Sequence, residues 1–169
     1  MTSKEDFKTV LVGESNVGKT CIISQFVLNK FDSESQPSNT AQFNSKEIKL
    51  ADNTSITLQI WDIAGQTKYR AVSKIFTKDA KALILIYDVT NENSFKELKD
   101  FWYSQVKDLN LTLAVVANKC DLSEKKVKDE EGKGFADSIG AIFATVSAKE
   151  NIGIQELFQK IAEAVKNKN

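Results

Sequence analysis

The chain has 169 residues, enough for one sizeable hydrophobic core, and its 23 basic and 23 acidic side chains cancel. A balanced charge gives no electrostatic support for a nucleic-acid binder, which normally carries a basic surplus. The absence of histidine excludes Ser-His-Asp and Cys-His hydrolases and His-ligated zinc sites. The length makes one domain the expectation, and because Cys21 and Cys120 are far apart and form no CxxC pair, we expect a reducing, intracellular compartment.

Strand and helix patterns alternate from the first apolar segment onward. Residues 7–12 are typical of a buried strand, and a glycine-rich turn and a segment with helical apolar spacing follow them. Residues 30–42, rich in Ser and Asn, predict a loop. Apolar runs at 43–50 and 56–61 flank a short polar turn and predict an antiparallel hairpin.

The second half of the chain predicts a sheet covered by helices. Residues 82–88 and 111–117 are typical of strands buried in a parallel sheet, with a helical segment, 94–109, between them. A last strand at 141–145 precedes an amphipathic helix at 153–166. We expect an α/β three-layer sandwich with a six-stranded, mostly parallel sheet, one antiparallel edge strand and about five helices.

Residues 13–20, Gly-Glu-Ser-Asn-Val-Gly-Lys-Thr, fit the pattern GxxxxGK[ST] between a predicted strand and a predicted helix. In a P-loop nucleoside triphosphatase this segment binds phosphate through backbone N–H groups, with Lys19 on the outer phosphates and Thr20 on Mg²⁺. A turn that only caps the helix is the alternative. The pattern alone does not distinguish ATP from GTP. The expected nucleotide-binding residues here are Ser15, Asn16, Val17, Gly18, Lys19, Thr20 and Cys21.

Two further segments predict a guanine pocket. Asn118-Lys119-Cys120-Asp121 fits NKxD after a buried strand, and the Asp121 carboxylate can accept two hydrogen bonds that guanine offers and adenine does not. The Ala148 amide, after the last strand, can donate to the guanine carbonyl. Taken singly, each segment could be an ordinary turn or capping loop. The candidate base-binding residues are Asn118, Lys119, Asp121, Ser147, Ala148 and Lys149.

Together with Asp62-Ile63-Ala64-Gly65-Gln66, these segments resemble the full motif set of Ras-superfamily small GTPases, in the same order and over essentially the whole chain. Residues 58–66 and 85–95 resemble the Rab branch. The resemblance implies that residues 1–169 form a single G domain. It also implies a molecular switch that binds GTP and GDP with Mg²⁺, hydrolyses GTP and regulates vesicle-mediated membrane traffic.

The resemblance also implies catalytic roles. Lys19 holds phosphate charge, Gln66 orients the attacking water, Asp62 anchors Mg²⁺ and the Gly65 amide contacts the γ-phosphate. Arg70, the chain's single arginine, follows Gln66 and is not placed to reach the γ-phosphate in cis. We therefore expect slow intrinsic turnover, about 10⁻⁴ to 10⁻³ s⁻¹, and an activating protein that supplies an arginine.

The first switch departs from the family pattern, because Ser38-Asn39-Thr40 stands where relatives carry Thr-Ile-Gly. Ser38 keeps a hydroxyl for Mg²⁺ and an amide for the γ-phosphate, and Thr40 is the candidate in another register. Phe31 falls where relatives pack an aromatic on guanine, although it could anchor the loop to the core instead. A nucleotide-binding scaffold with an altered switch and a P-loop kinase are the rival interpretations.

Phe43, Trp61 and Phe76 fall where Rab proteins present an aromatic triad to effectors, although three core aromatics would look the same. The resemblance implies a monomer whose partners are an exchange factor, an activating protein, a GDP-dissociation inhibitor and effectors of the GTP state, and no nucleic acid. It places the protein in the cytoplasm, on the cytosolic face of endocytic or secretory membranes. Relatives are tethered by a prenylated tail; residues 166–169 contain no cysteine, so we expect that the tail is truncated.

Overall fold

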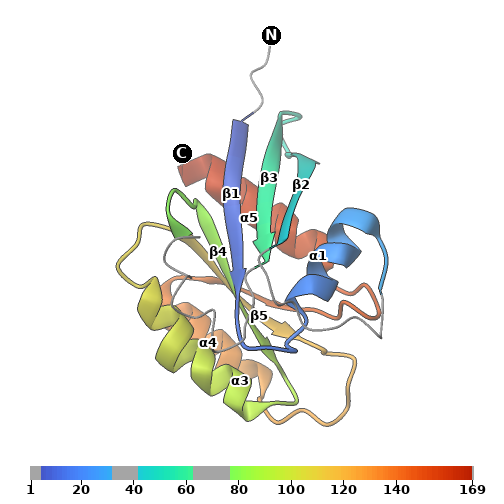
Figure 1. Ribbon diagram of the computed structural model, residues 1–169, viewed down its shortest axis with the longest axis vertical. Coiled ribbons are helices and arrows are strands. Elements are labelled where there is room, and N and C mark those ends of the chain that lie inside the picture. The colour runs from blue at the N-terminus through green and yellow to red at the C-terminus, as the bar shows by residue number, and fades with distance from the viewer. Residues whose placement is uncertain (1–4, 32–41, 63–76, 169) are drawn as a thin grey trace.

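The computed structural model of the chain describes residues 5–31, 42–62 and 77–168 (Figure 1). Within these residues six strands form one sheet in the order β2-β3-β1-β4-β5-β6. β2 pairs antiparallel with β3, and every other neighbouring pair is parallel, which confirms the predicted sheet. The strands are β1 (Glu5–Val12), β2 (Gln42–Lys49), β3 (Ser55–Asp62), β4 (Ala82–Asp88), β5 (Thr112–Asn118) and β6 (Ile142–Thr145).

Helices cover both faces of the sheet, as expected for a three-layer sandwich. α1 and α5 lie on one face, and α3 and α4 lie on the other (Figure 1). The described residues contain four α-helices, slightly fewer than the five or so that the sequence predicted. None of the helices described is both long and apolar enough to cross a membrane. The helices are α1 (Lys19–Leu28), α3 (Glu92–Glu97), α4 (Asp129–Ile139) and α5 (Ile154–Lys168).

The predicted helix 94–109 is irregular in the structure. After α3 the chain continues through a π-helical turn, Leu98–Trp102, and a 3-10 turn, Tyr103–Gln105. The start of α3 is fixed by the Asn91 side chain, which accepts a hydrogen bond from the Ser94 amide. Such a cap satisfies one of the backbone N–H groups that a helix leaves unpaired at its first turn.

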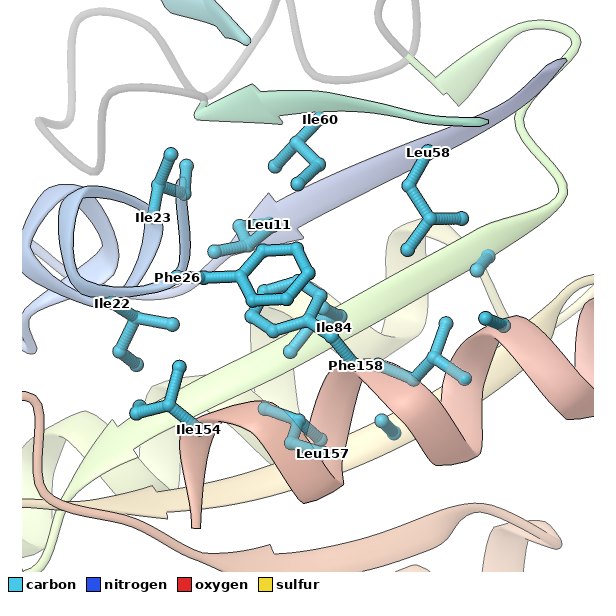
Figure 2. Packing of buried hydrophobic residues seen from close by; sticks show 14 of the residues in the cluster. Leu11, Ile22, Ile23, Phe26, Leu58, Ile60, Ile84, Ile154, Leu157 and Phe158 are labelled. Atoms are coloured by element: carbon cyan, nitrogen blue, oxygen red, sulfur yellow. The ribbon is translucent and has the colours of Figure 1, made fainter. Parts of the chain in front are cut away.

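Two apolar clusters, one on each face of the sheet, make up the core. Between α1, α5 and the sheet, the rings of Phe26 and Phe158 stack with centroids 4.0 Å apart, over the buried Ile84 of β4 (Figure 2). On the other face, Tyr87 and Trp102 are the largest buried side chains. Burial on both faces explains why β4 is apolar throughout, without the alternation of a one-sided strand.

The sheet places several polar residues along one edge. Five parallel strands, β1, β3, β4, β5 and β6, end there, and the sequence motifs stand at the ends of four of them, β1, β3, β5 and β6. Asp88, the last residue of β4, is directly opposite Asn118, the last residue of β5. Asp62 is the last residue of β3, which pairs with β1 on the side away from β4. In open α/β sheets, ligands bind outside such carboxyl ends.

Candidate functional site

The phosphate loop runs from the end of β1 to the start of α1, and two of its glycines are sterically required. Gly13 has φ +152° and Gly18, the N-cap of α1, has φ +100°. A Cβ atom on Gly13 would lie 2.3 Å from the carbonyl oxygen of Ile86, and one on Gly18 would lie 2.2 Å from Nδ2 of Asn118. No side chain fits at either position, so the backbone can approach its neighbours and a ligand closely.

Lys19, the first residue of α1, points its ammonium back into this loop. Its Nζ donates to the carbonyl oxygens of Gly13 at 3.1 Å and Glu14 at 2.9 Å. Burial lowers the pKa of Lys19, while the carboxylates of Asp62 and Glu14 oppose that shift. A cation held by backbone carbonyls at a helix N-terminus is placed to attract an anion such as a phosphate.

The side chains of Thr20 and Asp62 meet next to this lysine. The Thr20 hydroxyl donates to Oδ2 of Asp62, and Asp62 is fully buried. Both residues supply the hard oxygen ligands that Mg²⁺ prefers. Within the described residues, no group of three or more His, Cys, Asp or Glu could hold a metal ion. The oxygens of Thr20 and Asp62 fit Mg²⁺ as it is commonly bound, by one or two side chains together with phosphate oxygens of a substrate.

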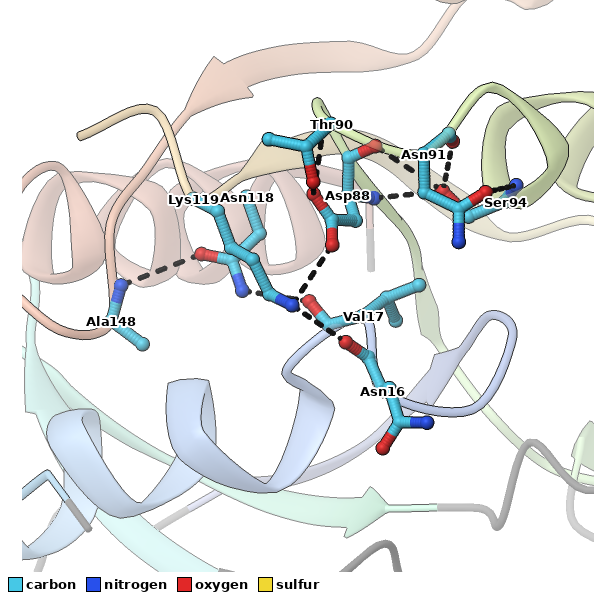
Figure 3. Close-up of polar contacts among 9 residues, drawn as sticks. All are labelled: Asn16, Val17, Asp88, Thr90, Asn91, Ser94, Asn118, Lys119 and Ala148. Atoms are coloured by element: carbon cyan, nitrogen blue, oxygen red, sulfur yellow. Dashed lines mark hydrogen bonds and ion pairs between the residues drawn. The ribbon is translucent and has the colours of Figure 1, made fainter. Parts of the chain in front are cut away.

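The NKxD segment is bonded directly to the phosphate loop (Figure 3). The Asn118 side chain donates from Nδ2 to the carbonyl oxygen of Val17 at 2.8 Å, and its Oδ1 accepts from the Ala148 amide at 3.4 Å. The Lys119 ammonium donates to the carbonyl oxygen of Asn16 at 2.9 Å. Three segments far apart in the sequence are thus joined in one polar network.

The remaining base-side residues are positioned by short hydrogen bonds. The Ser147 hydroxyl, fully buried, donates to Oδ1 of Asp121 at 2.7 Å and accepts from the amide of Glu150 at 3.0 Å. Asp121 itself is exposed. A buried side chain of α1, Gln25, donates from Nε2 to the carbonyl oxygen of Ala148 at 2.6 Å. No local sequence pattern points to Gln25, because its partner follows it by 123 residues.

The phosphate loop is also bonded to the irregular segment after α3. The indole Nε1 of Trp102, a side chain only 1% exposed, donates to Oε1 of Glu14 at 2.9 Å. Trp102 ends the π-helical turn, and such turns are frequent at functional sites. This is a second contact that sequence reasoning missed.

Comparisons with known proteins identify the family of this chain. A sequence model described as the Ras family matches residues 8–167. The chain is 37% identical to Ras-related protein Rab-3 of Caenorhabditis elegans, over 96% of this chain and 75% of that protein. It is 35% identical to Ras-related protein Rab-31 of Mus musculus, over 98% and 86% of the two chains, and 36% identical to human Ras-related protein Rab-22A, over 95% and 84%. The chain belongs to the Ras family, in its Rab branch.

This membership confirms the activity that the sequence predicted. As a Rab-like small GTPase, the protein binds GTP and GDP, hydrolyses GTP and regulates vesicle traffic at endomembranes. Like other Rab proteins, it works with regulators and effectors.

The structure brings most of the predicted nucleotide residues of this Rab-like GTPase together. The phosphate loop and the start of α1, residues 15–21, lie beside the Asn118 and Lys119 side chains, and the loops at 118–121 and 147–149 adjoin. Phe31 is 37% exposed at the end of a described segment. Several predicted residues lie outside the described ranges: Ser38, Thr40, Gly65, Gln66, Arg70 and Phe76.

Two of the three predicted effector aromatics form a pair in the Rab-like fold. The rings of Phe43 on β2 and Trp61 on β3 have centroids 4.9 Å apart and planes tilted by 51°. Phe43 is 50% exposed, and Trp61 is half-buried. An aromatic so exposed is not a core residue, which argues against the alternative interpretation for Phe43.

Proposed function

We propose that the phosphate loop, the NKxD segment and the loop at 147–149 form one site that binds GTP and GDP with Mg²⁺, and that its occupancy switches partner binding. The observation that supports this most strongly is the pair of hydrogen bonds from Asn118 and Lys119 to the carbonyls of Val17 and Asn16. They join the NKxD segment directly to the phosphate loop, so that a single nucleotide would contact one with its base and the other with its phosphates.

Guanine selectivity would come from groups that adenine leaves unpaired. The Asp121 carboxylate, oriented by Ser147, would accept from the guanine ring N–H and amine. The Ala148 amide would donate to the guanine carbonyl. Lys119 and Phe31 would lie against the faces of the base, where aromatic stacking typically contributes about 1 to 3 kcal/mol. Adenine would desolvate the carboxylate without returning two hydrogen bonds.

The phosphates would lie at the N-terminus of α1. Lys19 would release its carbonyl partners to bind the outer phosphates, assisted by the loop amides of residues 15–21. Thr20, Asp62 and Ser38 would hold Mg²⁺, which neutralises charge on the phosphate oxygens. Removing divalent ions with EDTA is expected to speed nucleotide release, and unchanged release would contradict this metal site.

Hydrolysis would be slow without a partner. Gln66 would orient the attacking water and the Gly65 amide would bind the γ-phosphate, while Lys19 holds charge that develops during transfer. Because Arg70 is the single arginine, the missing charge would come from an activating protein. Single-turnover hydrolysis of GTP is expected at about 10⁻⁴ to 10⁻³ s⁻¹. A rate of about 1 s⁻¹ without a partner would contradict the prediction that an activating protein supplies the missing charge.

Loss of the γ-phosphate would remove its contacts with the switch segments, so partner affinity would fall with hydrolysis. Effectors of the GTP state would bind the surface that includes Phe43, Trp61 and Phe76. An exchange factor would reload GTP, and a GDP-dissociation inhibitor would bind the GDP state. Residues 1–169 would act as a single, monomeric G domain on the cytosolic face of endocytic or secretory membranes.

The first test is the identity of the nucleotide that copurifies with the protein. The protein is denatured and the released nucleotide is separated by ion-exchange chromatography. The parent and Lys133→Ala, which changes an exposed lysine on α4, are expected to release GDP, and Lys19→Ala is expected to release none. Adenine nucleotide, or no nucleotide from the parent, would overturn the proposal, and retained GTP would favour the scaffold with an altered switch.

A further inference from the structure

The end of β4 carries an acidic side chain that no step of the proposed function uses. Asp88 is only 6% exposed and lies opposite Asn118 in the sheet register. Its Oδ2 forms an ion pair with Nζ of Lys119 at 2.8 Å (Figure 3). The pair therefore connects the end of one strand to the lysine that follows the next strand.

The carboxylate of Asp88 is held in one orientation by its own turn. Oδ1 accepts hydrogen bonds from the amide of Thr90 at 2.8 Å and from its hydroxyl at 2.7 Å. The Asp88 amide donates to the hydroxyl of Ser94 at 3.0 Å, and that fully buried hydroxyl donates to the Asn91 carbonyl at 2.7 Å. With Oδ1 and the backbone fixed, Oδ2 is left facing Lys119.

Lys119 needs such an anchor. A lysine side chain has four rotatable bonds and loses considerable entropy when it is confined. Its backbone has φ +66°, a left-handed conformation that non-glycine residues adopt uncommonly. The ammonium lies between two acceptors on different segments, Oδ2 of Asp88 and the carbonyl oxygen of Asn16 at 2.9 Å. The ion pair with Asp88 thus opposes rotation of the Lys119 side chain and movement of its ammonium away from the phosphate loop.

We propose that Asp88 is a positioning residue for nucleotide binding: it holds the Lys119 ammonium against the phosphate loop and so fixes the base side and the phosphate side of the site relative to one another. This inference rests on the proposed function. A residue that only caps the turn before α3 would need Oδ1 alone. The separate use of Oδ2 for Lys119 is what distinguishes the two roles.

The test measures the release of fluorescently labelled GDP into an excess of unlabelled GDP. Asp88→Asn keeps the shape and the Oδ1 acceptor but can place an amide donor opposite the ammonium. GDP release is expected to be about tenfold faster than from the parent. This is near the lower end of the effect of losing a hydrogen bond to a charged group, because the Lys119 side chain is about one-third exposed and solvent screens the interaction. Glu5→Gln removes the same charge from the remote Glu5–Lys166 pair and is expected to leave release unchanged.

A double-mutant cycle separates positioning from a structural effect. In a Lys119→Met background, which lacks the ammonium, Asp88→Asn is expected to cause no further acceleration. Parent-like release from Asp88→Asn, or the same fold-increase in both backgrounds, would overturn the inference while leaving the proposed function intact. A parent that binds no guanine nucleotide would overturn both.

A second variant keeps the test decisive if Asp88→Asn does not yield folded protein by circular dichroism. Thr90→Val removes one of the two hydrogen bonds to Oδ1 and lets the carboxylate turn away from Lys119. Release is then expected to quicken by about two- to threefold, in the parent background only. A rate equal to that of the parent would overturn the inference.

Discussion

Replacing Gln25 by leucine tests how the base-carbonyl contact is built. Gln25 is buried in α1, and its Nε2 donates to the carbonyl oxygen of Ala148 at 2.6 Å. Leucine has a similar volume but no donor, so the Ala148 carbonyl, in a residue 3% exposed, would lose this hydrogen bond. The peptide that follows β6 would then be free to turn, and the Ala148 amide would turn with the loop.

The size of the effect follows from burial. Leaving a buried carbonyl without its donor costs about 1 to 3 kcal/mol, and about 1.4 kcal/mol corresponds to tenfold in affinity. Part of that cost falls on folding, so we expect the GDP affinity of Gln25→Leu to fall by about tenfold. The loss should concern the guanine carbonyl, for which Ala148 is the proposed donor, rather than the amine, for which Asp121 is the proposed acceptor.

Competition against labelled GDP with three nucleotides separates these contacts. IDP keeps the base carbonyl and lacks the amine, whereas the diphosphate of 2,6-diaminopurine riboside keeps an amine and replaces the carbonyl. For Gln25→Leu the preference for GDP over the diaminopurine nucleotide should shrink by about tenfold, and the preference over IDP should persist. Gln159→Leu, which removes an exposed bond to the Lys49 carbonyl, is the control. Equal losses for all three nucleotides, or none, would refute the reasoning.

Two further substitutions test close contacts. In Gly132→Ala on α4, the new Cβ would lie 2.1 Å from the Tyr87 hydroxyl, so urea unfolding at saturating GDP should show a loss of about 1 to 3 kcal/mol. The Tyr87 hydroxyl is buried, which raises its pKa, and no described residue hydrogen-bonds it. Removing this hydroxyl by adding Tyr87→Phe should therefore relieve the clash and recover part of the lost stability. If no stability is recovered, the clash is not the cause. In Gly18→Ala the new Cβ would clash with the Asn118 side chain, and the backbone at this position has φ +100°, which strains any residue other than glycine. We expect at least about a hundredfold loss of GDP affinity with an unchanged circular dichroism spectrum. Parent-like affinity would exclude that clash.

Local patterns in the sequence determined the strands, the hairpin and the phosphate loop. An apolar run, a turn sequence or a GxxxxGK[ST] segment depends on neighbours within a few residues, and these predictions were accurate to about one residue at 82–88 and 43–50. α4 was not located, because its sequence includes two glycines and few apolar residues. Besides a few apolar side chains, it packs through the close approach of Gly132 to Tyr87, which a pattern of apolar positions does not record.

The tertiary structure alone decided which polar side chains hold the site in place. Gln25 hydrogen-bonds the Ala148 carbonyl, Trp102 hydrogen-bonds Glu14, and Asp88 forms an ion pair with Lys119. Nothing near each of these residues in the chain indicates its partner. The physical reason is that most buried polar groups hydrogen-bond to a partner, and the sheet order and helix register decide which group lies beside them. β4 lies next to β5 only after all the crossovers have been made, so the anchor of Lys119 is a property of the assembled sheet.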